Sequence, residues 1–382
     1  MGVMLETKPT WTDRVTVGRD WARIERLANT AEAFPEERAR ANGAHLEADV
    51  ITGFGSSTPS SRQVLLHAYA GWDGPDRRPP VLLVHGATAD AACWIRPYGH
   101  KGVGLAERFA ADGRRVFAVT FAHKHGCNLL QAEQLNQALR RVRAMAGAGL
   151  VDVLAHSKGA VAARALASGF REPWMTPYNN DIRRLILVGA PNGGIDYSFR
   201  HPLANLALIP EKACLNAPMS WRKARLFGFW VDTGARSIMT DAGNYFPGQA
   251  QMLARWDHRF PLTPYEPDWH ATYHGGTGLF GQSDGIDVAI AQSGHFMARL
   301  AEHPLHPDVE LAMLAGNRAN RLGYLNETSG PSDGTVFVES ATATADLLCG
   351  GATLRACDVL PLNHGELIYH EAAHAWFAKV LA

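Results

Sequence analysis

Val151-Asp-Val-Leu-Ala-His-Ser-Lys-Gly-Ala-Val-Ala-Ala-Arg-Ala165 is the most informative stretch of the chain, because an apolar strand-like run meets an alanine-rich helix-like run at Ser157. A serine on so tight a turn adopts a strained backbone conformation, and its neighbours two positions away must be small where strand and helix approach closely. Ala155 and Gly159 are small. The pattern predicts a turn that presents the Ser157 hydroxyl as a nucleophile; the alternative is an ordinary strand-to-helix turn that happens to hold a serine.

Length, composition and charge limit the class of protein. The chain has 382 residues, 46% of them hydrophobic, which favours one large decorated α/β domain over two domains. Its 37 basic and 37 acidic residues balance, so no overall field favours nucleic acid or an anionic membrane. Apolar runs such as 81–84 and 185–188 are far shorter than the roughly 20 residues of a membrane-spanning helix. An uncharged or small substrate fits this composition best.

The N-terminus and the cysteines bear on the compartment. The first residues lack the basic start, apolar centre and cleavage site of a signal peptide, which predicts a cytoplasmic protein, or a secreted one if the N-terminus was trimmed. Gly2 is no myristoylation signal, because Glu6 stands where Ser or Thr is needed. Five cysteines without a Cys-x-x-Cys pair indicate neither a zinc ribbon nor a complete disulfide framework. Cys349 and Cys357 could still form a disulfide in an exported protein.

Residues 1–62 are predicted to form an N-terminal helical extension. The region 11–48 is charged and rich in alanine, and its apolar residues recur at helical spacing, as shown by Trp21, Ile24, Leu27 and Ala28. This spacing predicts an amphipathic helix that packs on the main body.

The following residues alternate between short apolar runs and helix-like segments. We expect strands at 64–69, 81–84, 116–119, 151–154 and 185–188, and helices at 105–111, 131–145 and 160–167. Short continuous apolar strands that alternate with helices are typical of a parallel sheet covered on both faces. The pattern returns with strands at 309–314 and 355–359 and a last helix at 365–381.

The alternation is interrupted by a long segment rich in aromatic residues, glycine and proline. So long a loop is improbable without structure of its own, which predicts a cap or lid over 193–304, between core segments 63–192 and 305–382. Most of its aromatic side chains are expected to form the core of the cap rather than an acyl pocket, namely Trp221, Phe227, Phe229, Trp230, Tyr245, Phe246, Trp256 and Trp269.

From about residue 64 to 382 the chain resembles the α/β-hydrolases of the bacterial lipase and esterase type. Four local matches carry the resemblance: Val81-Leu-Leu-Val-His-Gly-Ala87, the turn at Ser157, Leu185-Ile-Leu-Val-Gly-Ala-Pro-Asn-Gly-Gly194, and the pair Ser332-Asp-Gly-Thr-Val336 and Leu362-Asn-His-Gly365. The chain order of serine, aspartate and histidine is the one this fold uses. The resemblance implies a mostly parallel sheet with helices on both faces and a large inserted cap.

The resemblance also implies the site residues. Ser157 would be the nucleophile, His364 its general base, and Asp333 the carboxylate that orients His364. The backbone N–H groups of Ala87 and Lys158 would hold the oxyanion, while the Lys158 side chain is free to point to solvent. We expect a lipase or esterase that acts on a small-molecule or lipid ester and needs no cofactor or metal. The sequence makes no prediction about its oligomeric state.

Asp284 and Asp287 are rivals for the acid, since Ser283-Asp-Gly repeats the Ser-Asp-Gly pattern. Asp333 is preferred because it follows a predicted core strand, whereas Asp284 lies in the predicted cap, where Asp-Gly pairs commonly make turns.

Histidines elsewhere suggest metal sites. His370-Glu-Ala-Ala-His374 matches a zinc-protease motif, but only eight residues follow it, too few for the usual downstream ligand. His123 and His125 could bind a metal with His100 or an aspartate, although no spacing requires it. His156 is expected to support the turn at Ser157. Two functional alternatives remain, an acyltransferase that uses the same triad and a noncatalytic binding protein on the same scaffold.

Overall fold

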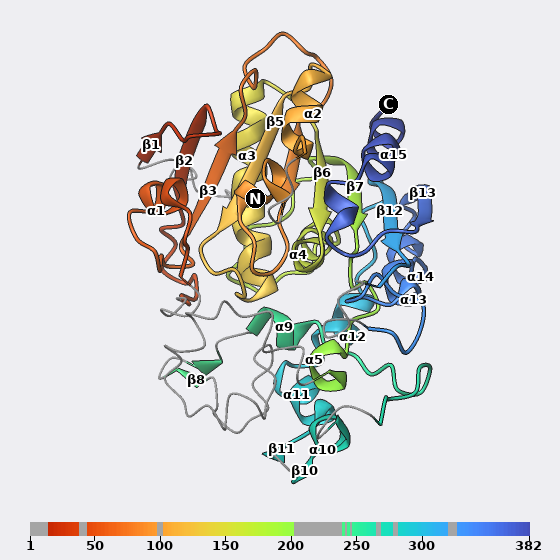
Figure 1. The fold of residues 1–382 in the computed structure, drawn as a ribbon. Helices are drawn as coiled ribbons and strands as arrows, with labels where there is room; N and C mark the ends of the chain where they lie inside the picture. The colour runs from red at the N-terminus through yellow and green to blue at the C-terminus, as the bar shows by residue number, and fades with distance from the viewer. Residues whose placement is uncertain are drawn as a thin grey trace, which may run out of the picture.

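The computed structural model describes residues 14–37, 44–97, 102–201, 239–240, 243–244, 247–264, 269–277, 282–319 and 327–382. Their main feature is a nine-stranded sheet with the strand order β1-β2-β3-β5-β4-β6-β7-β12-β13 (Figure 1). The strands are β1 (Arg14–Thr16), β2 (Arg23–Ala28), β3 (Gln63–Ala68), β4 (Val81–Val84), β5 (Val116–Phe121), β6 (Val151–His156), β7 (Ile182–Val188), β12 (Glu310–Gly316) and β13 (Thr353–Leu360).

The sheet is mostly parallel. Strands β1, β2, β3 and β5 pair antiparallel in sequence, and the pairs from β5 through β4, β6, β7 and β12 to β13 are all parallel. The parallel strands β4, β5 and β6 are buried along their whole length. Strands covered on both faces read as continuous apolar runs, which is why the sequence predicted them correctly.

Helices cover both faces, and the covered faces form the two main hydrophobic clusters. One cluster joins sheet residues such as Val153 to α3 (Asn128–Ala146) and α4 (Lys158–Ala167). The other joins residues such as Leu154 to α1 (Ala48–Phe54), α2 (Leu105–Ala111) and α15 (Glu371–Leu381). The predicted α/β architecture is therefore confirmed.

The predicted N-terminal helix over 11–48 is wrong. Residues 23–28 form strand β2. Its Ile24 packs in the hydrophobic cluster that contains α2, and its Leu27 packs in the cluster on the other face, which contains α3. Residues three apart lie on opposite faces of a strand, and both faces of this sheet are buried. The apolar spacing therefore matched a helix, although it arose from a strand that is buried on both sides.

The segment predicted to be a cap contains several short elements that lie beyond one end of the sheet in Figure 1. They are α5 (Tyr197–Arg200), β8 (Met239–Thr240), β9 (Gly243–Asn244), α9 (Pro247–Gln251), α10 (Trp269–His274), β10 (Gly276–Thr277), β11 (Gln282–Ser283) and α11 (Ile286–Gln292). The next helix, α12 (Phe296–Ala301), packs through Phe296 and Leu300 into the main core. The boundaries 193 and 304 stay a prediction, and Trp221, Phe227, Phe229, Trp230, Tyr245 and Phe246 lie outside the described residues.

The C-terminal segment differs in detail from the prediction. Short helices α13 (Val338–Ala341) and α14 (Ala345–Leu348) precede β13. The last helix begins at Glu371 rather than Gly365, after a separate 3₁₀ turn at Glu366–Ile368. His370 sets this start, because its side chain caps the helix by accepting the N–H of Ala372.

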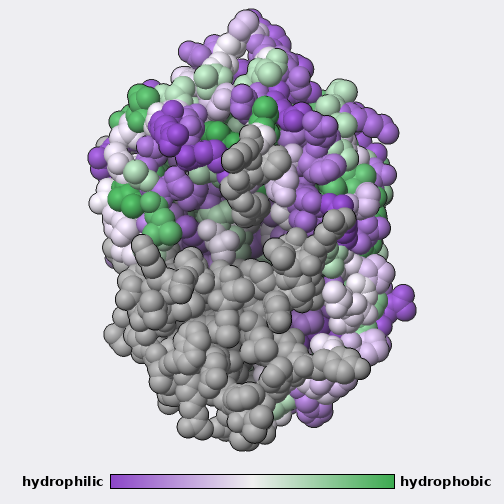
Figure 2. Space-filling view, viewed as in Figure 1, coloured by the Kyte–Doolittle hydropathy of each residue, from purple (hydrophilic) through white to green (hydrophobic). Residues whose placement is uncertain are grey.

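Figure 2 shows hydrophilic residues over most of the coloured face, with hydrophobic residues only in scattered groups. Among the described residues, no helix has the length and apolar character needed to cross a membrane. Cys349 and Cys357 are both free and exposed, so the disulfide suggested for them is not formed.

Candidate active site

Ser157 lies on the sharp turn between β6 and α4. Its φ of 54° and ψ of −129° place it in a conformation that side chains rarely adopt. The turn needs close packing: a Cβ at residue 159 would lie 2.2 Å from the carbonyl oxygen of His85, and one at residue 86 would lie 2.8 Å from the Cβ of Ser157. Glycine at 86 and 159 therefore lets the loop after β4 lie directly against the serine.

The structure brings Ser157, His364 and Asp333 into one hydrogen-bonded chain. The Oγ of Ser157 lies 2.9 Å from Nε2 of His364, and Nδ1 of the same imidazole lies 2.7 Å from Oδ2 of Asp333. With Asp333 ionised, Nδ1–H donates to the carboxylate, which leaves Nε2 free to accept the serine proton. Ser157 is half-buried, and the His364 side chain is 19% exposed.

Asp333 is held by its own turn. Its second carboxylate oxygen, Oδ1, accepts the backbone N–H groups of Thr335 at 2.9 Å and Val336 at 2.8 Å. The residue is 1% exposed. Because Oδ1 is occupied by the turn, Oδ2 remains for His364, and the carboxylate keeps one fixed orientation.

His85 fixes the peptide that follows it. Its Nε2 accepts the N–H of Phe121 at 3.1 Å, so Nδ1 carries the proton and donates to the carbonyl of Gly86 at 2.7 Å. Burial lowers the pKa of His85 to about 3, which keeps the ring neutral. The peptide is trans, so the N–H of Ala87 points away from the carbonyl that His85 holds. The Lys158 N–H is the first of α4 and has no acceptor within the helix.

The sequence had suggested that the side chain of Lys158 points to solvent, and the structure contradicts this. It is buried, with Nζ donating to Oε1 of Gln131 on α3. It also lies against α9, where a Cβ at residue 248 would come 2.1 Å from Cε of Lys158. Burial lowers the pKa of Lys158 to about 7 and raises that of nearby Glu37 to about 7. The first residue of α4 thus anchors the turn at Ser157 to the neighbouring helices α3 and α9.

The structure combines a serine on a tight strand-to-helix turn, backbone N–H groups after β4 and after that serine, and contacting serine, histidine and aspartate side chains in the chain order serine, aspartate, histidine. The chain has the α/β-hydrolase fold. This assignment also accounts for the mostly parallel sheet and for helices on both of its faces.

Comparison with known proteins gives distant structural likenesses. No protein-family model matches the chain, and no curated protein matches it. The mature form of a Bacillus licheniformis lipase is similar at 17% identity and a TM-score of 0.47, over 81% of this chain and 95% of that one. A thermostable carboxyl esterase from Bacillus coagulans is similar at 14% identity and a TM-score of 0.42, over 84% and 95% of the two chains. Epoxide hydrolase A from Mycobacterium thermoresistibile is similar at 14% identity and a TM-score of 0.39, over 91% of this chain and 98% of that one. At these values the reaction has to be inferred from the chain's own residues.

The rival acids lie in other surroundings. Asp284 is exposed just before α11. Asp287 is exposed on α11 and pairs with Arg255 at 2.8 Å. Asp333 is the carboxylate that contacts Nδ1 of His364.

The two histidines of the zinc-protease pattern do not both lie inside the helix. His370 precedes α15 as its cap, whereas His374 lies in the helix and is buried. The Nε2 of His374 donates to the carbonyl of Ile368 at 3.3 Å, and burial lowers the pKa of His374 to about 4. Nδ1 of His370, which accepts the N–H of Ala372, and Nε2 of His374 are thus both engaged in hydrogen bonds and are not free to bind a metal.

His123 and His125 are buried among polar groups of the chain. The N–H of His125 donates to Nδ1 of His123 at 3.1 Å, and the side chain of Gln249 contacts Nδ1 of His125. Residue 100 lies outside the described residues. No group of three metal-ligating side chains is found in the part of the chain that the structure describes.

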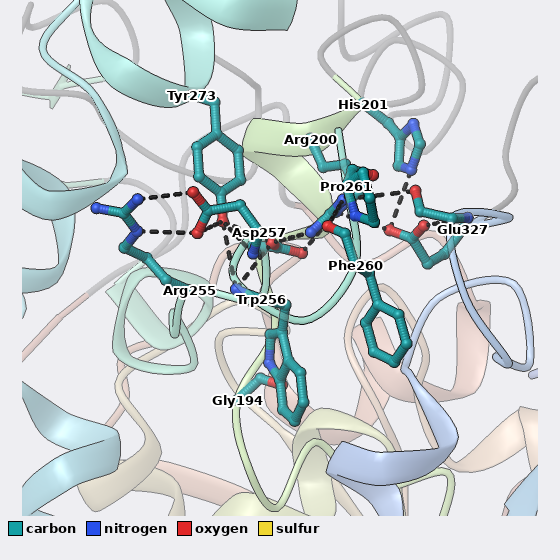
Figure 3. Close-up of polar contacts among 12 residues, drawn as sticks. Gly194, Arg200, His201, Arg255, Trp256, Asp257, Phe260, Pro261, Tyr273 and Glu327 are labelled. Carbon is teal, nitrogen blue, oxygen red and sulfur yellow. Dashed lines mark hydrogen bonds and ion pairs between the residues drawn. The ribbon is translucent and has the colours of Figure 1, made fainter. Parts of the chain in front are cut away.

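A buried ionic network, which the sequence did not predict, joins Arg200 and its neighbours in the segment predicted to be a cap to Glu327 (Figure 3). Arg200 has a side chain 0% exposed and pairs with Asp196 at 2.7 Å and Glu327 at 3.2 Å. It also donates to the carbonyls of Phe260 and Pro261, each at 3.0 Å. In the sequence, only the spacing of Asp196 and Arg200, four residues apart, could have indicated this network, because Glu327 comes from a distant part of the chain.

Glu327 connects this network to the turn that holds Asp333, residues 332–336, which we call the acid turn. Its carboxylate contacts Nε2 of His201 at 3.1 Å as well as Arg200. Its backbone N–H donates to the carbonyl of Gly334 at 2.9 Å, and its carbonyl accepts the hydroxyl of Ser332. The acid turn is thus closed by the same residue that binds Arg200.

Arg200→Met is expected to destabilise the fold by about 3–5 kcal/mol, because it leaves two buried carboxylates without their shared cation. The control is Arg259→Met, which removes an ion pair to Glu339 of similar length, 2.8 Å, whose side chains are 60% and 49% exposed. That exposed pair should contribute little. Urea denaturation followed by tryptophan fluorescence compares the two variants, and equal midpoints would contradict the structural importance of the network.

Proposed function

We propose that the protein is a serine-dependent carboxylic ester hydrolase of the lipase or esterase kind. The observation that supports this function most is the hydrogen-bonded chain from Ser157 through His364 to Asp333. A serine hydroxyl is a weak nucleophile at neutral pH, and an adjacent imidazole that accepts its proton activates it.

In the proposed acylation step, Oγ of Ser157 attacks the ester carbonyl carbon while its proton passes to Nε2 of His364. Asp333 stabilises the imidazolium that forms. The N–H groups of Ala87 and Lys158 would bind the oxyanion, a role that depends on backbone position rather than on side-chain identity. Collapse of the tetrahedral intermediate breaks the ester C–O bond, and His364 gives the proton to the leaving alcohol. Water then attacks the acyl-enzyme with His364 again as the base, which releases the acid and restores Ser157.

A screen over p-nitrophenyl esters from acetate to long acyl chains tests this proposal. We expect turnover of at least part of the series, with the preferred chain length set by the residues that cover Ser157. A jump in rate above the solubility limit of the long-chain esters would indicate interfacial activation. Absence of turnover across the whole series would contradict ester hydrolysis.

The acyltransferase alternative has the same first step and differs only in the acceptor. Product analysis with and without an added alcohol separates the two reactions, because a transferase forms the new ester in preference to the free acid. Predominant ester formation at low alcohol concentration would replace the hydrolase assignment with a transferase one.

A further inference from the structure

A second histidine, His156, packs against His364. It is the last residue of β6, immediately before Ser157, and it is buried. Its ring centroid lies 4.7 Å from that of His364, with 40° between the two planes. The Nε2 of His156 lies 3.1 Å from the backbone carbonyl oxygen of His364. A residue of the nucleophile turn thus contacts both the ring and the main chain of the proposed base.

The hydrogen bond determines the state of His156. A carbonyl oxygen only accepts, so Nε2 of His156 carries the proton and donates it. Burial and the nearby His364 hold the pKa of His156 well below its usual value, so the ring stays neutral. With Nε2–H directed at a carbonyl, this nitrogen is not available to take the proton of Ser157.

The main chain of His364 is therefore held on both sides. Its N–H donates to the backbone carbonyl of Asp333 at 2.8 Å, and its own carbonyl accepts from His156. The first bond fixes the histidine to the acid turn, and the second fixes it to the strand that ends at Ser157. The 2.9 Å contact between Ser157 and His364 joins two segments that are 207 residues apart in sequence.

On the assumption that the proposed function is correct, we propose that His156 is a positioning residue that holds the imidazole of His364 against Oγ of Ser157. The ring supplies a packing surface for the base, and Nε2–H fixes the backbone from which the base projects. Small displacements of a reacting group, of the order of 1 Å, can cost about 10²-fold in rate. A loss of this contact should thus appear in the chemical step and not in substrate binding.

Two substitutions separate the hydrogen bond from packing. His156→Leu removes the donor and keeps an apolar side chain, whereas His156→Gln keeps an amide N–H near the position of Nε2. For a p-nitrophenyl ester we expect His156→Leu to lower kcat by ~10- to 10²-fold with KM changed less than about twofold. We expect His156→Gln to recover most of that loss.

The matched control is His374, another buried histidine, whose Nε2 donates to the backbone carbonyl of Ile368 rather than to that of His364. His374→Leu should reduce thermal stability as much as His156→Leu and leave kcat within about twofold of wild type.

The rate of Ser157 labelling by a fluorophosphonate probe is measured in parallel, because it requires the base but not the native ester. We expect slow labelling of His156→Leu and near-normal labelling of His156→Gln and His374→Leu. If the wild type is labelled and His156→Leu is labelled at the same rate, the positioning role is overturned while the proposed function stands. Equal slowing of His156→Leu and His156→Gln overturns the part assigned to the Nε2–H hydrogen bond, because it would show that only the packing of the ring positions the base. Absence of labelling in wild type overturns the proposed function, and the positioning role with it.

Discussion

Ser157→Ala is expected to lower kcat for a p-nitrophenyl ester by about 10⁶-fold, the size of effect seen when the nucleophile of a serine triad is removed. Among the described residues, Ser157 is the hydroxyl that contacts Nε2 of His364, whereas His364 has the proposed role of base and Asp333 is buried. The residual rate would come from the oxyanion donors and substrate binding. Steady-state kinetics over the ester series measures the loss.

Ser168→Ala is the matched control for this substitution. Ser168 lies at the opposite end of α4, and its buried hydroxyl has no hydrogen-bond partner among the described residues. We expect its kcat to equal that of wild type, and both alanine variants to keep the wild-type circular dichroism spectrum. A Ser157→Ala variant with unchanged turnover would rule out the proposed mechanism.

Asp333→Asn is expected to lower kcat by about 10⁴-fold, because an amide in place of the carboxylate favours the wrong tautomer of the base. The amide N–H of the variant would donate to Nδ1 of His364 and leave the proton on Nε2, where it blocks proton transfer from Ser157. A carboxylate is also needed to stabilise the imidazolium.

Asp284→Asn is the control, since it makes the same change at an exposed aspartate of a second Ser-Asp-Gly sequence, just before α11. We expect it to keep wild-type activity. Loss of activity in Asp284→Asn with a fully active Asp333→Asn would show that the acid has been assigned to the wrong turn.

The central sheet was predictable because its strands are short, apolar and separated by helix-like segments. The runs at 81–84, 151–154 and 185–188 lie in β4, β6 and β7, each paired with parallel neighbours. The N-terminal strand β2 was misassigned because a strand buried on both faces lacks the simple alternation that distinguishes it from a helix. Tertiary burial, which the local pattern does not contain, decided its structure.

The residues predicted for the site come together in the structure, and each had a local turn as its signal. Ser157, Asp333 and His364 each occupy a short turn next to a core strand, and the fold brings the three side chains into contact. Their catalytic roles stay proposals. The burial of Lys158 depends on Gln131 of α3 and Gly248 of α9, which adjoin it only in the folded chain. Arg200 and Glu327 were missed for the same reason.

Intact-protein mass spectrometry after treatment with a fluorophosphonate tests the central claim most directly, because only an activated serine reacts readily with the probe. We predict one adduct per chain, located by peptide mapping on Ser157 and absent from both Ser157→Ala and His364→Ala. An unlabelled wild-type protein, or an adduct that persists in Ser157→Ala, would contradict the account.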